Sequence, residues 1–425
     1  MSKVLQIILF ILVINSIAFT QSKWRQLDSV TNVNLKKVCF VDTLNGWIGG
    51  EAGTILYTSN GGKNWESRNV PTNWILRDIF FLNHNNGWAL YDSAVGINII
   101  SVLYYTSDKG SSWQTYSSSF DNKLLNSVCF VDSLTGFLTS RLGTILKTED
   151  AGVSWKACKI LDHPQAYFEK NDIKFYNKQN GFVCGGRTDM GGIWWVTNDC
   201  GETWSTHAVT MEPVNGLCII DSANVIGIGG DPEGNLNFCK TTDGGSLWTY
   251  KNLVFFGMGL TIGARTKNEF WACQNGMNAI LSTTDAGENW ISNTIPDNKT
   301  LSDIIFVDSC KGFAAGRGGV IFKYDSSYPV SVGREIKNEK FILHQNYPNP
   351  FNPSTTISFN LEHSQNVKLF IYNMLGQKIC TLIDKYCASG VNSLTFKGDG
   401  LPSGNYYYVL LSDNFIEAKK MQLLK

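Results

Sequence analysis

The octad TTDAGENW at residues 283–290 is one of six copies of a single motif in this 425-residue chain. The copies share the pattern Thr-x-Asp-x-Gly-x-x-Trp, with Asn60 replacing Asp in the first, and their closing tryptophans stand 42 to 49 residues apart. The other copies are TSNGGKNW (58–65), TSDKGSSW (106–113), TEDAGVSW (148–155), TNDCGETW (197–204) and TTDGGSLW (241–248). A period of roughly 40–50 residues is typical of one blade of a β-propeller.

A second motif precedes the octads and occurs seven times. Each copy is an apolar run, a turn rich in Asp, Asn and Gly, and in most copies an aromatic residue that opens the next run. The copies are FVDTLNGW (40–47), FLNHNNGW (81–88), FVDSLTGF (130–137), FYNKQNGF (175–182), IIDSANVI (219–226), ARTKNEFW (264–271) and FVDSCKGF (306–313). With a third strand before the octad and a fourth after it, the repeat predicts an all-β, seven-bladed propeller.

The two ends of the repeat region complement each other. The seventh unit reaches GVIFKYDSS (319–327) and then lacks an octad, whereas KWRQL (23–27) resembles the segment that follows an octad elsewhere. We therefore expect the strand of Trp24 to complete the last blade beside residues 319–325, which would close the ring and remove a free sheet edge. The predicted propeller covers residues 23–325.

The octads resemble the Asp-box, also called the bacterial neuraminidase repeat. The Asp carboxylate is expected to accept backbone N–H groups in a hairpin turn, Gly to take the positive-φ position, and Trp to pack between blades. These structural positions are Asn60, Asp108, Asp150, Asp199, Asp243, Asp285, Trp65, Trp113, Trp155, Trp204, Trp248 and Trp290. Identical turns far from any shared cleft do not make catalytic acids, and one Asp per turn supplies too few ligands for calcium. We expect no metal and no cofactor.

The whole repeat resembles the propellers of photosystem II assembly-factor-like proteins over residues 23–325. That resemblance implies a scaffold that binds protein rather than a catalyst. Neutral overall charge, with 36 Lys and Arg against 36 Asp and Glu, also argues against a nucleic-acid partner.

Residues 341–425 carry a second set of motifs after a polar linker at 326–340. NYPNPFNP (346–353), IYNMLGQ (371–377), LPSGNYYY (401–408) and KKMQLLK (419–425) resemble the type A C-terminal sorting domain of the type IX secretion system. The alternating runs predict a small antiparallel β-sandwich. The resemblance implies recognition by the outer-membrane translocon, cleavage within 325–342, and a secreted or surface-attached product.

The N-terminal residues 1–20 have the pattern of a secretory signal peptide, with Lys3 before a short apolar run. No later stretch is apolar enough to span a bilayer as a helix. The eleven cysteines lie mostly at strand positions, form no Cys-x-x-Cys pair and suggest no structural zinc. A disulfide between Cys380 and Cys387 across a hairpin remains an open alternative.

A ligand-binding face is expected where inner strands begin and second strands end. Aligning the repeats places charged candidates there: Glu51, Asp78, Asp92, Arg141, Asp172, Arg187, Asp231, Asp303 and Arg317. A mixed-charge rim favours a protein surface or a glycan as the partner.

An enzyme is the alternative, because Asp-boxes also occur in sialidases and xyloglucan-cleaving enzymes. The Arg-Ile-Pro motif of sialidases is missing, and the best carboxylate pair for a glycosidase, Asp78 with Asp92, has no supporting motif. The sequence therefore favours a secreted or cell-surface, non-catalytic binding scaffold over a surface glycoside hydrolase.

Overall fold

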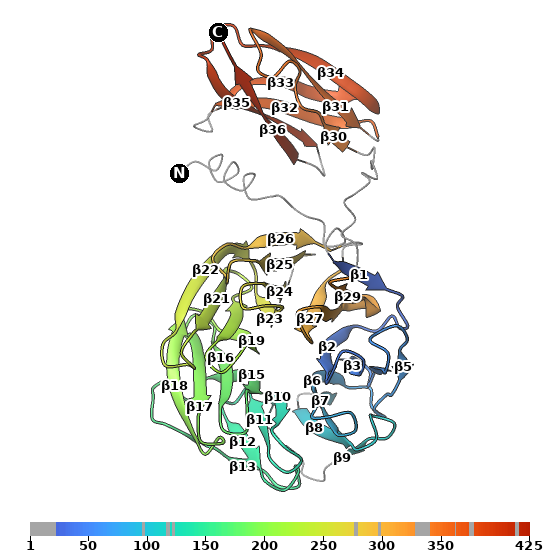
Figure 1. Cartoon of the computed structure of the whole chain (residues 1–425), viewed down its shortest axis with the longest axis vertical. Coiled ribbons are helices and arrows are strands. Elements are labelled where there is room, and N and C mark those ends of the chain that lie inside the picture. The colour runs from blue at the N-terminus through green and yellow to red at the C-terminus, as the bar shows by residue number, and fades with distance from the viewer. Residues whose placement is uncertain are drawn as a thin grey trace. The chain divides into compact units, whose positions relative to one another are not determined.

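A computed structural model describes residues 23–95, 98–115, 120, 124–275, 279–295, 299–327, 341–361, 363–373, 378–412 and 416–425 (Figure 1). The described residues up to 327 belong to one compact unit and those from 341 onward to another. The predicted signal peptide at 1–20 and residues 328–340 of the predicted linker lie outside the described residues.

The described part of the first unit forms seven sheets. Neighbouring strands follow one another in the chain, except that Lys159–Ile160 and Trp24–Leu27 each join the outer edge of a sheet. The first three are β2 (Leu35–Phe40), β3 (Gly46–Gly50), β4 (Ile55–Thr58) and β5 (Glu66–Ser67); β6 (Ile75–Phe81), β7 (Gly87–Val95), β8 (Asn98–Thr106) and β9 (Gln114–Thr115); and β10 (Leu125–Phe130), β11 (Gly136–Ser140), β12 (Ile145–Thr148) and β13 (Lys156–Ala157). The fourth contains β15 (Glu169–Phe175), β16 (Gly181–Arg187), β17 (Gly191–Thr197) and β18 (Thr203–Thr210), with β14 (Lys159–Ile160) added parallel to β18.

The remaining three sheets complete the first unit. They are β19 (Val214–Ile219), β20 (Val225–Gly230), β21 (Asn235–Thr241) and β22 (Thr249–Phe256); β23 (Gly259–Ala264), β24 (Phe270–Gln274), β25 (Ala279–Thr283) and β26 (Ile291–Thr294); and β27 (Leu301–Phe306), β28 (Lys311–Gly316), β29 (Ile321–Asp325) and β1 (Trp24–Leu27), with the 3-10 turn η3 (Arg317–Gly319) between β28 and β29. The first strand of each sheet contacts the first strand of the next, and β27 contacts β2. Figure 1 shows these inner strands around a common centre, which is the arrangement of a β-propeller.

The ring is closed by strands from both ends of the unit. β1 pairs antiparallel with β29 in the register Trp24↔Tyr324 to Leu27↔Ile321, as the sequence predicts. Trp24 is fully buried, and its ring makes edge contacts with Trp271 and Phe306 at centroid distances of 5.9 and 5.6 Å. Because large aromatic side chains bury much surface, the packing of Trp24 stabilises the ring closure in addition to the pairing of the four residues of β1.

The second motif marks the seams between sheets. Phe81 stacks on Trp47 of the preceding sheet at 3.6 Å, and Phe130 stacks on Trp88 in the same way. The glycine of the motif lies under the same Phe ring: a Cβ on Gly87 would stand 2.4 Å from Phe81. In these copies the Phe ring fills the space over the bare glycine backbone and also packs on an aromatic residue of the preceding sheet.

The octads form hairpin turns between third and fourth strands. In one copy, Thr106 donates its hydroxyl to Asp108 at 2.8 Å and accepts the N–H of Gly110, while Asp108 accepts the N–H of Ser112 at 2.9 Å. The other five copies repeat this network. The prediction of one positive-φ residue was incomplete, because the residue before each Gly, such as Lys109, is also left-handed. Trp204 and Trp290 are buried, and the other four closing tryptophans are partly buried.

The second unit contains two antiparallel sheets. One contains β30 (Phe341–Leu343), β31 (Ser354–Leu361) and β34 (Gly390–Lys397), and the other β33 (Lys378–Cys387), β32 (Gln365–Asn373), β35 (Gly404–Ser412) and β36 (Ile416–Leu423). Residues of both sheets share one core, for example Phe359 with Leu369 and Tyr408. The segment NYPNPFNP packs along β36, where Phe351 donates its backbone N–H to Gln422 at 2.9 Å.

The cysteines are unpaired, with all eleven thiols free. A hairpin disulfide between Cys380 and Cys387 is wrong, because both residues lie on the single strand β33. Seven residues of extended strand separate their Cα atoms by far more than a disulfide spans.

Candidate binding face

A β-bulge occurs at the same place in all seven inner strands. The register shifts between Leu35 and Lys37 in the first sheet and at the corresponding residues of the other six. The residues inside the bulges are Lys36, Arg77, Asn126, Asn171, Asn215, Leu260 and Ser302. Because a bulge places two residues opposite one, each strand turns an extra side chain toward the face where inner strands begin.

Three asparagines among these bulge residues connect neighbouring sheets. The side-chain amide of Asn126 donates to the backbone oxygen of Lys170 at 3.0 Å, and that of Asn215 donates to the backbone oxygen of Gly259 at 3.0 Å. Asn171 donates to both Val214 and Asn215. This chain of amides fixes the spacing of the third to sixth sheets on this face.

Two arginines share one carboxylate beside the amide chain. Asp92 is buried and accepts Arg77 Nε at 2.5 Å, Arg141 Nη2 at 2.7 Å and Ser101 Oγ at 2.7 Å. Burial, and then repulsion from Arg77, lower the pKa of Arg141. Asp92 and the nearby Glu169 both attract Arg141. The two guanidinium groups offer hydrogen-bond donors to an anionic group of a partner.

The remaining rim candidates are more exposed. Glu51 pairs with Lys36 at 2.9 Å and accepts the side-chain amide of Asn34 at 3.0 Å. Burial opposes the ionisation of Glu51, but these two hydrogen bonds lower its pKa below the ordinary value. Arg187 at the end of β16 and Arg317 at the start of η3 are exposed to solvent.

Three predicted face residues lie instead inside the ring. Asp78, Asp172 and Asp303 are buried. Each carboxylate accepts a backbone N–H from an adjacent sheet. The donors are Val128 for Asp78 at 2.9 Å, Leu217 for Asp172 at 3.2 Å, and Val38 for Asp303 at 2.8 Å. Their placement on an exposed ligand surface is therefore corrected, because these carboxylates fasten sheets together.

Two lysines lie near these buried charges, Lys37 on β2 and Lys174 on β15, the strand that also carries Asp172. Burial disfavours the ammonium of Lys37, but attraction by Asp303, Asp78 and Asp172 raises its pKa above the ordinary value. Lys174 lies 3.6 Å from Asp172 and donates to the backbone oxygen of Leu217 at 2.6 Å. The centre of the ring is thus a charge-compensated set of groups rather than an open pocket of one sign.

The same arrangement bears on the carboxylate pair predicted for a hydrolase. Asp78 accepts Ser127 Oγ at 2.6 Å in addition to Val128 N, and burial raises its pKa. Asp92 is held by two arginines and Ser101. The two carboxylates lie on the paired strands β6 and β7 but belong to separate hydrogen-bond sets, and protein groups already bind each of them.

Asp231 meets two carboxylates that the repeat alignment did not indicate. Its carboxylate oxygen and those of Asp189 and Glu212 lie within 4.8 Å of one another, and Glu212 also accepts the backbone N–H of Asp189 at 3.2 Å. These residues come from the β16–β17 hairpin, the β18–β19 connection and the β20–β21 hairpin. The alignment missed Asp189 and Glu212 because they stand in insertions of unequal length, and it missed Arg77 because the bulge residue precedes the aligned position.

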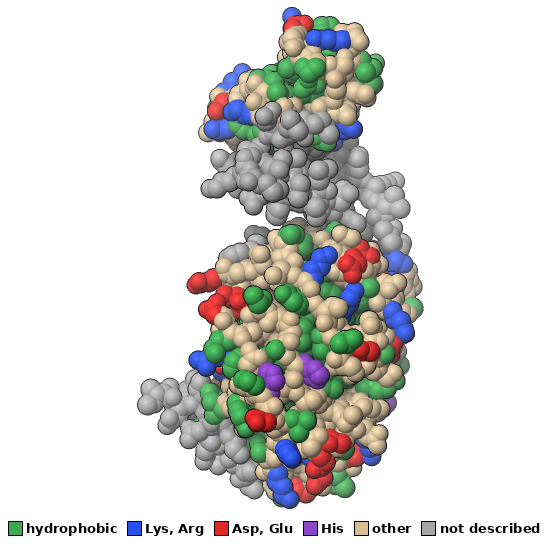
Figure 2. All heavy atoms as spheres, turned by 90° about the vertical axis from the view of Figure 1, so that its left-hand side faces the viewer, with side chains coloured by type: hydrophobic (Ala, Val, Ile, Leu, Met, Phe, Trp, Pro, Cys, Tyr) green, Lys and Arg blue, Asp and Glu red, His purple; other side chains and the backbone are tan. Residues whose placement is uncertain are grey.

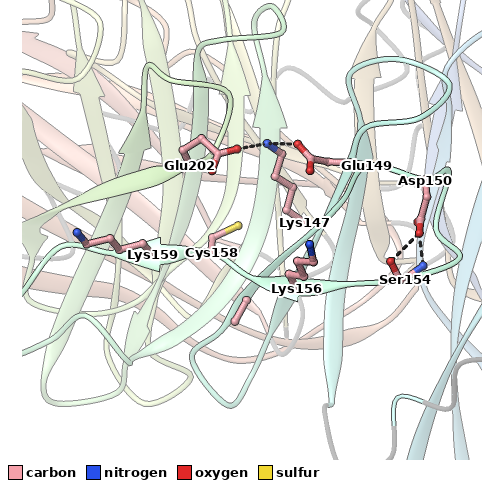
Figure 3. Close-up of a pocket in the computed structure, with 10 residues that line it drawn as sticks. Lys147, Glu149, Asp150, Ser154, Lys156, Cys158, Lys159 and Glu202 are labelled. Carbon is pink, nitrogen blue, oxygen red and sulfur yellow. Dashed lines mark hydrogen bonds and ion pairs between the residues drawn. The ribbon is translucent and has the colours of Figure 1, made fainter.

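A shallow hollow of about 430 Å³ lies away from this face, between the octad turns of the third and fourth sheets (Figure 3). The amine of Lys147 lies between the carboxylates of Glu149 and Glu202, at 3.0 Å from the former. Burial opposes the charge of Lys147, but the two carboxylates raise its pKa. Because two carboxylates already neutralise the Lys147 cation, this hollow between two octad turns is a weak candidate for an anion site.

Comparisons with known proteins agree with the fold. The profile of the family described as "Photosynthesis system II assembly factor YCF48" matches residues 17–158 and 105–213, and that of the "Secretion system C-terminal sorting domain" matches residues 345–423. The photosystem II stability/assembly factor HCF136 of Arabidopsis thaliana is 24% identical over 71% of this chain and 79% of its own.

Solved structures share the propeller. A structure of YCF48 bound to D1 peptide has a TM-score of 0.57 at 19% identity and covers 73% of this chain and 97% of its own. The GH74 xyloglucanase of Xanthomonas campestris has a TM-score of 0.55 at 11% identity, covering 79% of this chain and 59% of its own. At these identities the likeness shows the fold alone.

The chain is therefore an Asp-box β-propeller joined to a domain that directs secretion. More closely, the propeller is of the photosystem II assembly-factor-like type, and the C-terminal unit is a type IX secretion system sorting domain. The sorting domain indicates a secreted or cell-surface protein. Within the described ranges, no helix is long and apolar enough to span a membrane.

Proposed function

We propose that this chain is a secreted or surface-attached, non-catalytic scaffold that binds a protein partner on the face carrying the bulge residues. In this proposal the seven sheets are the blades of one seven-bladed propeller over residues 23–325, and the two C-terminal sheets form a sandwich over 341–425. Residues 1–20 direct export across the inner membrane. The sandwich is then recognised by the type IX translocon, with 326–340 as the linker.

The observation that carries this proposal is the group formed by Arg77, Asp92 and Arg141. Its geometry is fixed by hydrogen bonds before any partner arrives, so little side-chain order is lost on binding. Its two guanidinium groups suit an acidic side chain of a protein partner. The structure of YCF48 bound to D1 peptide shows a similar protein with a peptide, which supports protein over glycan as the partner class here.

A capture experiment tests the binding role. The secreted full-length protein is immobilised and incubated with envelope and supernatant proteins of the producing cells, and bound proteins are identified by mass spectrometry. Arg187→Glu with Arg317→Glu alters two exposed rim charges, and Arg77→Gln with Arg141→Gln removes the arginine pair. Lys156→Glu with Lys159→Glu makes an equal charge reversal on the outer edge. Partner capture should fall at least tenfold in both rim variants and persist in the control; equal capture by all would contradict the proposal.

Export has a separate test. Deleting residues 341–425 should leave the propeller in the periplasm, because the sorting domain is lost. Unchanged surface display of the truncated chain would contradict the assigned route. The hydrolase alternative has no specific observation in its favour, since protein groups already bind the carboxylates of both Asp78 and Asp92.

A further inference from the structure

Four large apolar side chains are exposed on one part of the same face. Leu142, Tyr167, Met190 and Met211 retain 57%, 74%, 51% and 68% of their accessible surface. Leu142 and Met190 lie in hairpins after second strands, and Tyr167 and Met211 lie in connections before inner strands. Scattered exposed apolar residues need no explanation, but neighbouring ones on a rigid support indicate an interaction surface.

These four segments are neighbours. Gly143 lies against the backbone of Tyr167, since a Cβ on Gly143 would stand 2.0 Å from the Tyr167 oxygen. Gln165 donates its side-chain amide to the backbone oxygen of Met190 at 3.0 Å, which joins the Tyr167 connection to the next hairpin. A Cβ on Gly192 would stand 2.4 Å from the Glu212 oxygen, which places the Met190 hairpin beside the Met211 connection.

A buried lysine fixes the middle of this row. Lys170 is fully buried, and its ammonium donates to the backbone oxygens of Gly143, Ala166 and Phe168 at 2.8 to 3.0 Å. The same ammonium lies 3.9 Å from the ring centroid of Trp195. This cation therefore ties the Leu142 hairpin to the Tyr167 connection, so the exposure of these side chains does not arise from a loose loop.

The carboxylates of Asp189, Glu212 and Asp231 end the row on the side of Met211. Three carboxylates so close together repel one another, and a cation between them would relieve that repulsion. We name the four apolar residues together with these three acids the Met211 sector. Figure 2 views the first unit from the side of β18 and β22 and shows acidic side chains at its left-hand edge, and also near its lower end and upper right, among apolar, polar and basic ones.

We infer that the Met211 sector binds a protein segment in which basic side chains alternate with large apolar ones. The apolar residues of the segment cover Leu142, Tyr167, Met190 and Met211, and its Lys or Arg side chains reach the three carboxylates. Charge complementarity selects a cationic segment, and the apolar row selects an amphipathic one. This inference rests on the proposed function, since it assumes that the face binds protein, and it names a second contact area and the chemistry that it takes.

Synthetic peptides test the chemistry directly. The probes are three capped 12-residue peptides with alternating Leu and Lys, alternating Leu and Glu, or alternating Ser and Lys, titrated into the full-length secreted protein by calorimetry. The Leu-Lys peptide should bind at least tenfold more tightly than the other two. Its affinity should fall as salt rises, because exposed charge pairs are screened.

Variants locate the binding. Met190→Ser with Met211→Ser, and separately Glu212→Gln with Asp231→Asn, should each weaken Leu-Lys binding at least tenfold. Leu134→Ser with Leu247→Ser removes two exposed apolar residues from the turns at the other ends of the strands, and Glu149→Gln with Glu202→Gln removes two charges there. Both control pairs should leave the affinity unchanged, which separates the sector from general adhesion to a cationic peptide.

Several outcomes would overturn the inference. Equal binding of the Leu-Glu peptide, or sector variants that bind like the wild type, would exclude this ligand chemistry or this location. Sedimentation that shows a dimer of the wild-type protein, and monomers for the Met190 and Met211 variant, would identify a second copy as the occupant instead. If rim variants abolish partner capture while the sector variants bind normally, this inference fails and the proposed function stands.

Discussion

Asp303 and Val38 join the two ends of the ring. The carboxylate of Asp303 accepts the backbone N–H of Val38 at 2.8 Å, although the two residues are 265 positions apart in the sequence. The same carboxylate attracts the ammonium of Lys37. The last sheet is thus fastened to the first by an ionic hydrogen bond at the centre, in addition to the pairing of β1 with β29 at the edge.

We expect Asp303→Ala to destabilise the propeller by about 2–4 kcal/mol, because it leaves a buried N–H unpaired and removes a charge that balances Lys37. Denaturant unfolding of the secreted protein, followed by tryptophan fluorescence, measures this loss. Asp162→Ala, at an exposed carboxylate in a connection, is the matched control and should change stability by less than about 0.5 kcal/mol. Similar unfolding curves for both variants would show that the hydrogen bond between Asp303 and Val38 contributes nothing to stability.

The seam glycines give a second prediction. Gly87→Ala would place a methyl group 2.4 Å from the ring of Phe81, which is itself stacked on Trp47 at 3.6 Å and has no room to move. Overpacking of this kind costs roughly 1–3 kcal/mol. Gly234→Ala is the control, because its Cβ would meet no atom closer than 3.5 Å. In a Phe81→Ala background the Gly87→Ala cost should largely vanish; an equal cost in both backgrounds would place the strain elsewhere.

The seams and the ring closure were predictable because they repeat. Five of the seven motifs place the glycine under an aromatic ring. The pattern is weaker in the fifth and sixth sheets, where Ile219 and Ala264 replace the first Phe and Val225 and Phe270 replace the glycine. The repeat also gave correct equivalences for the bulges. The repeat alignment placed Asp78 on the ligand face, although the bulge inserts one residue before it. A shift of one position turns a strand side chain to the opposite side of the sheet. Arg77, one residue earlier, therefore reaches the rim.

The Met211 sector was not predictable in the same way. Its side chains stand in connections whose lengths differ from blade to blade, so no column of the repeat contains them. Lys170 illustrates the difficulty: its position corresponds to Leu35 and Leu125 in other sheets, both buried and apolar. The three carbonyl oxygens that make a lysine acceptable there come from the folded Tyr167 connection, which supplies Ala166 and Phe168, and from the neighbouring hairpin, which supplies Gly143.

The octad turns give a third prediction, at Asp150. Asp150 accepts the hydroxyl and the N–H of Ser154, and these bonds lower its pKa to about 2. In the first copy, the side-chain oxygen of Asn60 accepts the hydroxyl of Thr58 and the N–H of Asn64, as Asp150 accepts those of Thr148 and Ser154. Asp150→Asn should therefore keep the melting temperature near that of the wild type, whereas Asp150→Ala should lower it measurably. An Asn variant that melts as early as the Ala variant would show that the charge, and not the acceptor geometry, holds the turn.

The last prediction concerns pH and Lys170. Burial lowers the pKa of this amine from 10.5 to about 7. Between these values the unfolded chain binds a proton that the folded chain does not, so the contribution of Lys170 to the free energy of unfolding rises with pH. Below about pH 7 both states carry the proton, and the contribution stays constant at its lowest value.

Lys170→Met removes the titrating group and leaves its apolar stem. The difference in unfolding free energy between the wild type and this variant should be flat from pH 6 to 7. It should then grow toward pH 10 by at most about 1.4 kcal/mol per pH unit. Urea unfolding at fixed ionic strength across this range measures the slope, with Lys156→Met at an exposed position as the control that should show none. A difference that stays constant to pH 10 would mean that the three carbonyl oxygens and the Trp195 ring hold the ammonium charged throughout, because they would then compensate fully for its burial.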